Sequence, residues 1–352
     1  MSRKASHAHV FLALVSTLLV AIIAIPLAHL IGGRDFRLKA FWQVIVVLPL
    51  FLPPFVGAIG LRQLLGRFGT FNLMLIESGL IENPIDFLGT WKPLGIILLQ
   101  AFHLYPIMYL QVVAARSQVR PSLLEAAAMS GAGAFSVWRS ITFPLLAPAI
   151  YSSAVLIFIG SFTDLGTPLL FDYRSVIAVQ IYDLISDVHE NPAGYSLVIM
   201  TLLLTVTGFL LAKRFEDSRV FTIDGRSEKS VLQKLSAGAT WVANVAIGLL
   251  VFLAFLPHAG VLLVSFAGDW FMTILPSTFT MQHYATVFSH PITSRSFLNS
   301  FCLSTMSAFL NLIIGVGVAW YVMRGHGPLK ILLMPSPSRP SRFQVSLSLF
   351  AI

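Results

Sequence analysis

The segment SLLEAAAMSGAG, Ser122 to Gly133, interrupts a chain that is otherwise strongly apolar. Pro121 suits the first turn of a helix, and Ser122 with Glu125 forms the S-x-x-E pattern of a capping box. Gly131 can close that helix in the left-handed conformation. The segment is too polar and too broken by glycine to cross a bilayer. We therefore expect a short helix that ends at Gly131 and lies on one face of a membrane.

A second short helix is predicted over residues 133–140, and we expect Phe143-Pro144 to stop it. The whole segment then reads as a helix-turn-helix on the membrane surface. Ala126, Ala127 and Ala128 carry almost no side chain, so another protein surface can approach this helix closely.

The composition assigns the chain to the membrane proteins. Hydrophobic residues make up 56% and charged residues 11% of the sequence, and the mean hydropathy is +0.82. A soluble globular chain carries roughly 25% charged residues. Apolar runs of about 20 residues, the length that a helix needs to cross a bilayer, recur along the chain. These runs predict an all-α, polytopic fold with about seven transmembrane helices: Val10–Ile31, Phe41–Leu61, Leu94–Ala115, Leu146–Leu170, Tyr195–Ala212, Trp241–Phe266 and Phe297–Met323.

Charge alternates between successive loops. Loops 32–40, 116–145 and 213–240 are rich in lysine and arginine, whereas the loops near Glu82 and Asp183 are acidic. Positively charged loops stay in the cytoplasm. The Ser122–Gly133 segment is therefore expected on the cytoplasmic side of the membrane. The net charge of +8 is spread over these loops, so it does not indicate nucleic-acid binding.

One longer pattern connects this segment with a known family. Glu125-Ala126-Ala127, Gly131, Ile141 and Pro144 follow the spacing E-A-A-x3-G-x9-I-x-L-P, with Phe143 at the leucine position. This pattern resembles the EAA loop of binding-protein-dependent ABC transporter permeases. The stretches LPLFLPP (48–54) and SFTDLGTPLL (161–170) look like the third and fifth spans of that group, above all of the fused two-module iron(III) permeases.

The resemblance implies a type I ABC importer permease fold in a bacterial inner membrane and assigns a role to the loop. The EAA loop of the family docks into a groove of a separate ATPase subunit, so the resemblance makes Glu125, Ala126, Ala127, Gly131, Ile141 and Pro144 the coupling residues. No G-x-x-x-x-G-K-[ST] motif occurs in the sequence, so ATP hydrolysis is expected in a partner rather than in this chain.

Three further residues are candidates for a translocation path. Pro53 and Pro54 free backbone groups that lipid cannot satisfy, so their span should face protein or water. A packing kink is the alternative. Asp164 is the one acid well inside a predicted span, where ionisable residues are usually functional. The alternative is that Asp164 lies at the outer end of this span, beside Gly166.

An internal repeat suggests a modular chain. Ala13–Lys39 aligns with Ser304–Lys330, each being one span followed by a short basic loop. We expect a first permease module at residues 1–235, with its EAA loop at 121–148 but without its first helix. We expect the start of a second module at 236–334 and an atypical tail at 335–352. On this interpretation the chain is truncated.

The sequence thus favours a permease subunit of an ATP-driven importer that is not itself an enzyme. Its expected partners are cytoplasmic ATP-binding subunits, a periplasmic substrate-binding protein and the lipid bilayer, with no nucleic acid, no cofactor and no bound metal. Iron(III) is the favoured substrate, and 2-aminoethylphosphonate, polyamine, thiamine and sulfate are alternatives. A secondary transporter is the competing class, although such proteins usually carry charges at the membrane midplane.

Overall fold

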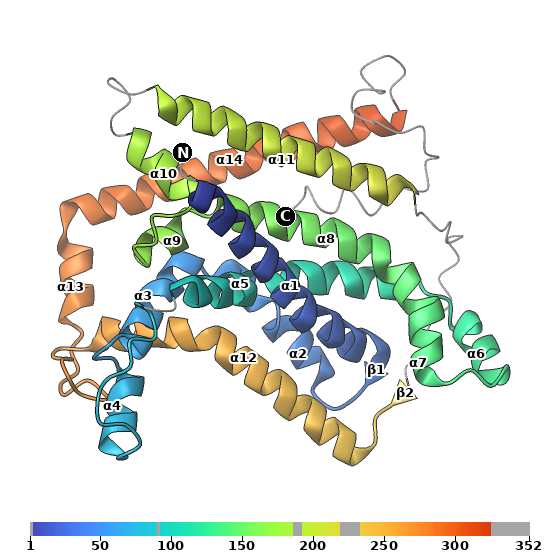
Figure 1. Cartoon of the computed structure of the whole chain (residues 1–352), viewed down its shortest axis with the longest axis horizontal. Coiled ribbons are helices and arrows are strands. Elements are labelled where there is room, and N and C mark those ends of the chain that lie inside the picture. Colours follow the sequence, from blue (N-terminus) through green and yellow to red (C-terminus); the bar gives the residue numbers. More distant parts are fainter. Residues whose placement is uncertain (1–2, 90–91, 186–191, 219–232, 325–352) are drawn as a thin grey trace. The chain divides into compact units, whose positions relative to one another are not determined.

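Long apolar helices dominate the structure (Figure 1). The computed structural model describes residues 3–89, 92–185, 192–218 and 233–324. The predicted tail at 335–352 lies outside the described residues, as do Arg219, Arg226 and Lys229 of the third basic loop. The elements in chain order are α1 (Arg3–Gly33), β1 (Arg34–Asp35), α2 (Lys39–Ile45), η1 (Leu48–Phe51), α3 (Pro54–Leu65), α4 (Thr70–Glu77), α5 (Lys92–Arg116), α6 (Pro121–Met129), α7 (Ala134–Val137), η2 (Trp138–Thr142), α8 (Phe143–Thr163), α9 (Gly166–Leu170), α10 (Ile177–Ile185), α11 (Ala193–Ser218), β2 (Gln233–Lys234), α12 (Ala237–Phe266), α13 (Gln282–Ser289) and α14 (Pro291–Arg324).

The predicted fold class is confirmed. Within the described residues, five helical segments are long and apolar enough to cross a membrane, and a sixth is the bent pair formed by residues 39–51 and 54–77. The apolar part of α11, Gly194–Leu210, is shorter. All seven predicted apolar segments are therefore helical, and five or six of them qualify as spans. The five long segments are His9–Gly33, Lys92–Arg116, Ala134–Leu170, Ala237–Phe266 and Pro291–Tyr321.

Two predicted spans are interrupted. The expected continuous helix Phe41–Leu61 bends by 91° between Phe51 and Pro54. Pro53 and Pro54 carry no N–H, and Pro53 adopts an extended backbone with ψ 126, so the α-helical hydrogen-bond ladder cannot continue there. The expected helix Leu146–Leu170 breaks after Thr163, because Asp164 is extended with ψ 119.

The chain divides into two compact units, Met1–Phe279 and Thr280–Ile352. In the first unit, α1, α5 and α8 pack around the main core, in which Val20, Tyr105, Met108 and Ile157 are buried. The second unit contains α13 and α14 in its described part. Along α14 large apolar side chains such as Phe297 and Trp320 are exposed, as expected for a helix that faces lipid.

Helix α12 packs against α3 at very short range. A Cβ atom added to Gly60 would lie 1.8 Å from the backbone oxygen of Pro257, and one added to Gly260 would lie 2.9 Å from that of Gly60. Small residues at such crossings let backbones approach inside a membrane, where packing rather than water exclusion drives association. This crossing joins the two predicted modules, whose boundary at residue 235 remains a prediction.

The described parts of the three basic loops meet at one end of the first unit. β1 pairs in parallel with β2, and the amide of Leu235 donates to the Asp35 carbonyl at 3.0 Å. Arg116, the last residue of α5, begins the second basic loop, and its side chain packs over Gly33 at the end of α1. The end that carries β1, β2, α6 and α7 lies opposite the end that carries α4, α9 and α10 (Figure 1).

Candidate functional site

The Ser122–Gly133 segment forms a helical hairpin that consists of α6, a turn and α7. The turn is a Schellman motif, in which Gly131 N–H bonds to the Ala128 carbonyl at 3.0 Å and Ala132 N–H to the Ala127 carbonyl at 3.1 Å. Gly131 has φ +76, as predicted. Only a residue that tolerates the left-handed region can occupy this position without strain.

The predicted capping box is wrong. Helix α6 begins at Pro121, with Arg120 as its N-cap residue and no side-chain cap hydrogen bond. Ser122 therefore lies inside the first turn. Because Pro121 has the φ of a helix and lacks an N–H, it starts α6 two residues earlier than the capping box would.

The predicted stop at Phe143-Pro144 is also wrong. Helix α7 continues through the π-helical turn η2 into α8, and the amide of Phe143 bonds to the Trp138 carbonyl. Pro144 has no N–H and would crowd the carbonyl four residues before it in a regular helix. The wider turn of η2, which comes directly before this proline, lets the helix continue. The hairpin is thus the direct extension of the span α8.

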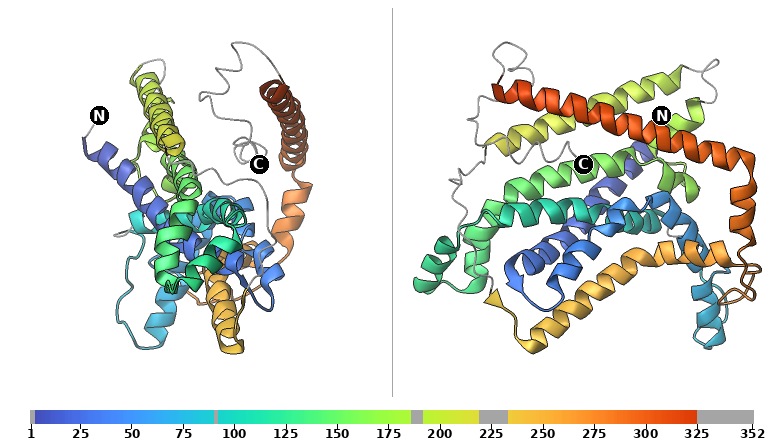
Figure 2. Two further views of the ribbon diagram at one scale, coloured as in Figure 1. Left: turned by 90° about the vertical axis from the view of Figure 1, so that its right-hand side faces the viewer. Right: turned by 180° about the vertical axis from the view of Figure 1, so that it is seen from behind.

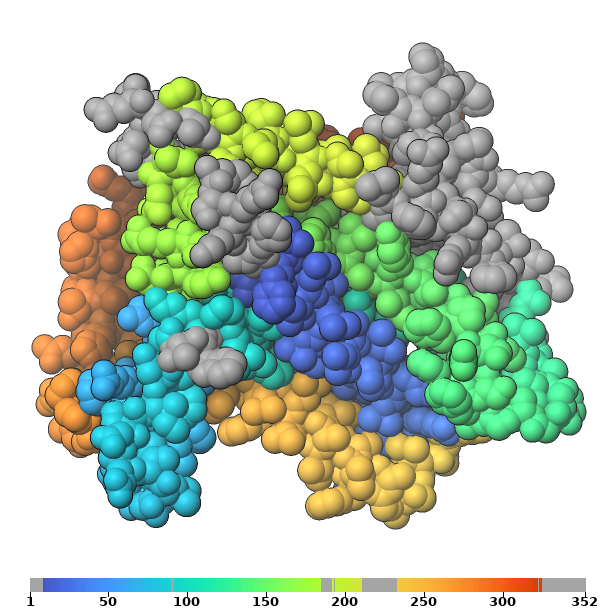
Figure 3. All heavy atoms as spheres, in the orientation of Figure 1, coloured from blue at the N-terminus to red at the C-terminus, as the bar shows by residue number. Residues whose placement is uncertain are grey.

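The hairpin exposes both small and large apolar side chains. Glu125, Ala126 and Gly131 are exposed and Ala127, Ile141 and Pro144 are half-buried, so none of these six family positions is in the core. Met129 is 84% and Phe135 is 71% exposed, on either side of the glycine turn. In Figure 2, α6 stands apart from the ends of α5 and α8, and in Figure 3 the hairpin forms the protruding edge of this end.

The base of the hairpin is anchored by the end of α5. Arg116 donates from NH1 to Nδ1 of His29 at 3.0 Å, and its guanidinium lies over Gly33, where a Cβ atom would come within 2.2 Å of it. Because α6 begins a short turn after Arg116, this contact fixes the hairpin relative to α1 and α5. The base of the hairpin is thus connected to α1 as well as to α5.

The predicted path residues lie at the two interruptions. Pro53 and Pro54 occupy the bend before α3, and Asp164 occupies the break between α8 and α9. The breaks are neighbours, because a Cβ atom on Gly166 would lie 3.0 Å from Cβ of Phe55. The structure thus brings these three residues to one region, away from the hairpin. Their role in translocation remains a prediction.

Sequence reasoning missed a buried polar cluster beside these breaks. Gln100 of α5 accepts from Ser16 at 2.8 Å and from Ser161 at 2.5 Å, and donates to the Asp164 carboxylate at 3.0 Å. An amide side chain in the apolar run Leu94–Ala115 was the available signal, although Gln111 of the same run carries it too. The exposed Met129 and Phe135 were also missed, since their exposure depends on how the hairpin projects.

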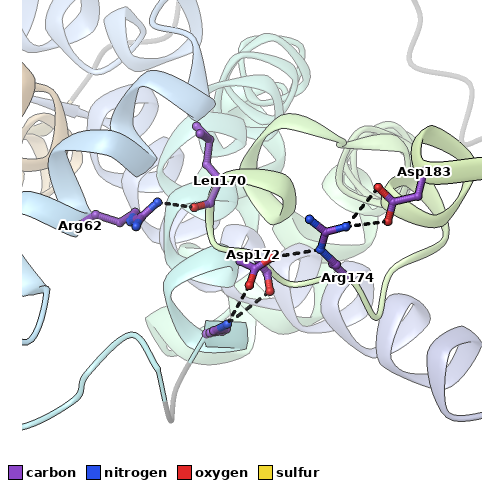
Figure 4. A network of polar contacts seen from close by, with 6 residues as sticks. Arg62, Leu170, Asp172, Arg174 and Asp183 are labelled. Atoms are coloured by element: carbon purple, nitrogen blue, oxygen red, sulfur yellow. Dashed lines mark hydrogen bonds and ion pairs between the residues drawn. The ribbon is translucent and has the colours of Figure 1, made fainter. Parts of the chain in front are cut away.

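The end opposite the hairpin carries an ion-pair network (Figure 4). Arg174 donates to Asp172 at 3.1 Å and to Asp183 at 3.3 Å, and Lys92 lies 4.0 Å from Asp172. Arg62 donates to the Leu170 carbonyl at 3.1 Å. The hydrogen bond from Arg174, followed by the positive charge of Lys92, lowers the pKa of Asp172.

Among the described residues, no group of three or more His, Cys, Asp or Glu side chains is placed to hold a metal ion. His103 and His258 instead lie beside the bend at Pro53. His103 Nδ1 is 3.1 Å from the Pro49 carbonyl, and neither ring nitrogen of His258 has a hydrogen-bond partner.

Residues 24–220 match the family of binding-protein-dependent transport system inner membrane components. The chain is 27% identical over 323 residues to the ferric transport system permease protein FbpB of Actinobacillus pleuropneumoniae, covering 89% of this chain and 45% of that protein. It is 27% identical over 298 residues to the putative ferric transport system permease protein FbpB 1 of Haemophilus influenzae, covering 83% and 46%. The chain thus spans less than half the length of these relatives.

A solved structure has a similar fold. The bacterial alginate ABC transporter, in complex with an alginate pentasaccharide-bound periplasmic protein, matches with a TM-score of 0.52 at 22% sequence identity. The match covers 60% of this chain and 77% of that chain. At this identity the likeness concerns the fold alone.

Proposed function

The chain belongs to the family of binding-protein-dependent transport system inner membrane components, and from this membership we propose that it works as the permease subunit of an ATP-driven importer. It passes a substrate that a periplasmic binding protein delivers. The protein spans the inner membrane of a bacterium, with the end that carries α6 in the cytoplasm, because the basic loops gather at that end.

The single observation that carries the proposal is the projecting hairpin 121–144. Met129 and Phe135 are both exposed beside the glycine turn, and exposed large apolar groups mark contact sites when they cluster. Ala126 and Ala128 between them let a partner surface come close to the α6 backbone. Glu125 and Arg139 add charges at the edge of this contact surface.

The proposed partner of the hairpin is a cytoplasmic ATP-binding subunit. The family pattern at Glu125, Ala126, Ala127 and Gly131 supports this choice, and so does the absence of a phosphate-binding motif from the sequence. A subunit that grips the hairpin moves α8 directly through η2, and moves α1 and α5 through Arg116. Nucleotide-driven motion in the cytoplasm is thereby coupled to the spans.

Iron(III) is the proposed substrate. Two relatives named as ferric transport permeases, whose matches cover most of this chain, support it. A water-filled path needs no iron ligands of its own if the binding protein delivers the ion.

The test is uptake of labelled iron(III) by membranes that contain the chain with its complete set of partner subunits. Replacing the phosphate-binding lysine of the ATPase subunit should abolish uptake, whereas dissipating the proton gradient at constant ATP should not. Uptake that survives the lysine replacement and stops without the gradient would identify a secondary transporter. ATP-driven uptake of a polyamine or an oxyanion, but not of iron(III), would change the substrate and keep the permease.

A further inference from the structure

Two of the apolar segments in the first unit are interrupted. The first break lies between Phe51 and Pro54, and the second lies at Asp164. Backbone groups that leave a helix inside a bilayer need partners from the protein or from water. The side chains that supply these partners therefore decide whether the broken spans stay in place.

Gln100 supplies the partner for the second break. Its Oε1 accepts hydrogen bonds from Ser16 of α1 and Ser161 of α8, and its Nε2 donates to Oδ2 of Asp164 at 3.0 Å and to the Ser161 carbonyl at 3.4 Å. The amide thus has each of its atoms engaged, and it is 3% exposed. The other carboxylate oxygen of Asp164 accepts from the amide of Thr167 in α9 at 3.3 Å.

His103 supplies a second partner at the first break. It follows Gln100 by one turn of α5, and its Nδ1 lies 3.1 Å from the Pro49 carbonyl, which also accepts from the amide of Leu52 at 3.3 Å. In a regular helix that carbonyl would accept from residue 53, which is a proline and has no N–H. Since a carbonyl oxygen only accepts, Nδ1 of His103 carries the hydrogen.

The two breaks also touch each other. Helix α9 packs against α3, and Gly166 lies so close to Phe55 that a Cβ atom would be 3.0 Å from Cβ of that phenylalanine. One turn of α5 therefore holds both interrupted spans at the same level. This level lies in the half of α5 nearer Lys92, away from the hairpin.

We propose that Gln100 and His103 are positioning residues that clamp the two interrupted spans against α5 and keep the end of the unit opposite the hairpin closed. The inference rests on the proposed transport function, in which that end must open to receive substrate. Opening then requires the Gln100–Asp164 and His103–Pro49 hydrogen bonds to separate. The clamp therefore sets the equilibrium between the closed and the open state of this end.

Thr167 is a suitable reporter of the clamp. It is fully buried next to the second break, and its hydroxyl has no hydrogen-bond partner, so a cysteine there loses no side-chain bond. Thr167→Cys would be introduced after Cys302→Ser, because Cys302 is the only native cysteine. The rate of maleimide labelling in nanodiscs, where both membrane faces are accessible, then measures opening.

Gln100→Leu and His103→Leu should each raise the labelling rate about tenfold, as expected from the loss of buried hydrogen bonds in a closed state. His103→Asn keeps a donor near the position of Nδ1 and should restore slow labelling. Gln111→Leu is the matched control, because Nε2 of Gln111 lies on the same helix without a partner. A second reporter, Ile31→Cys at the buried opposite end, should stay unreactive, which excludes global unfolding.

Equal labelling in the Gln100→Leu and Gln111→Leu proteins would overturn the clamp. The clamp would also be overturned if Gln100→Leu raised the labelling rate but left the half-saturation and the maximal rate of uptake by the full transporter unchanged. The hydrogen bonds of Gln100 would then be structural only. The labelling needs no ATPase, binding protein or substrate. If the parent chain takes no part in ATP-driven uptake, the proposed function fails. The labelling rates of the variants still test the clamp independently of that result.

Discussion

Gly131 and Gly133 lie in the same hairpin, yet their backbones differ. Gly131 has φ +76, whereas Gly133 has φ −66, and a Cβ atom added to either would meet no other atom within 4 Å. A side chain would therefore find equal room at the two positions, and the positions differ only in backbone conformation. The left-handed turn at Gly131 was predictable from the sequence, because an alanine-rich helix followed by glycine is a common helix ending.

Gly131→Ala should weaken the hairpin by about 1 kcal/mol or more, because an L-residue is strained at this φ. Gly133→Ala should have little effect. We expect ATP-driven uptake to fall in the Gly131→Ala protein, while its amount in the membrane matches that of the Gly133→Ala protein. Equal uptake by the two variants would mean that the turn is not part of coupling.

Asp172 combines a strained backbone with an ion pair. Its φ is +49, which is unusual for a residue other than glycine, and its carboxylate accepts from Arg174 at 3.1 Å. Arg174 lowers the pKa of this carboxyl in the folded protein. The pair therefore stabilises the fold above the ordinary carboxyl pKa, and the contribution disappears as the pH falls through the lowered value.

Asp172→Asn should lower the Tm slightly at neutral pH, since asparagine tolerates the left-handed backbone but cannot form the ion pair. The difference in Tm should shrink as the pH falls below about 4, where the carboxyl of the unfolded chain gains its proton, and vanish below the lowered pKa of the folded protein. High salt should reduce it at neutral pH. Scanning fluorimetry of both proteins checks this, and a difference that grows in acid would contradict the assigned pKa direction.

At the scale of elements, the crossing of α3 and α12 depends on two kinds of glycine contact. Gly60 faces the backbone of Pro257 and Val261, whereas Gly57 faces side-chain atoms of Leu99, His258 and Pro257. Backbone cannot move aside without moving the whole helix. Side chains can yield by a few tenths of an ångström.

Gly60→Ala should therefore cost at least about 1–3 kcal/mol through overpacking, and Gly57→Ala less. The Tm of each variant in detergent measures the difference. A Gly60→Ala protein as stable as the Gly57→Ala protein would show that the helices separate easily at this crossing.

The existence of the helices was predictable from the sequence, but their continuity was not. Apolar runs identified every long span, and Pro53-Pro54 signalled an irregularity, yet no local pattern gave the 91° angle of the bend. In contrast, Pro144 does not end a helix, because the π-helical turn at Trp138–Thr142 accommodates it. Whether a proline breaks or only widens a helix is decided by neighbouring turns that local sequence rules do not specify.

At the scale of the whole molecule, loop charge anticipated how the first unit is arranged. The described basic loops around Arg34, Arg116 and Lys234 meet at one end, whereas Asp172 and Asp183 lie at the other. The buried cluster around Gln100 was not predictable, because it joins α1, α5 and α8, whose packing no local pattern encodes. The candidate path residues came from two separate stretches, Pro53-Pro54 and Asp164, and only the fold makes these stretches neighbours.

The central claim is that the hairpin docks onto an ATP-binding subunit, and site-specific photo-crosslinking in membranes with active transport tests it most directly. A photoreactive amino acid at Met129 or Phe135 should yield a covalent adduct with the ATP-binding subunit. The same group at Leu80, which is 73% exposed in the loop at the opposite end, should not. If the hairpin positions yield no such adduct, or if Leu80 yields it equally, the account is contradicted.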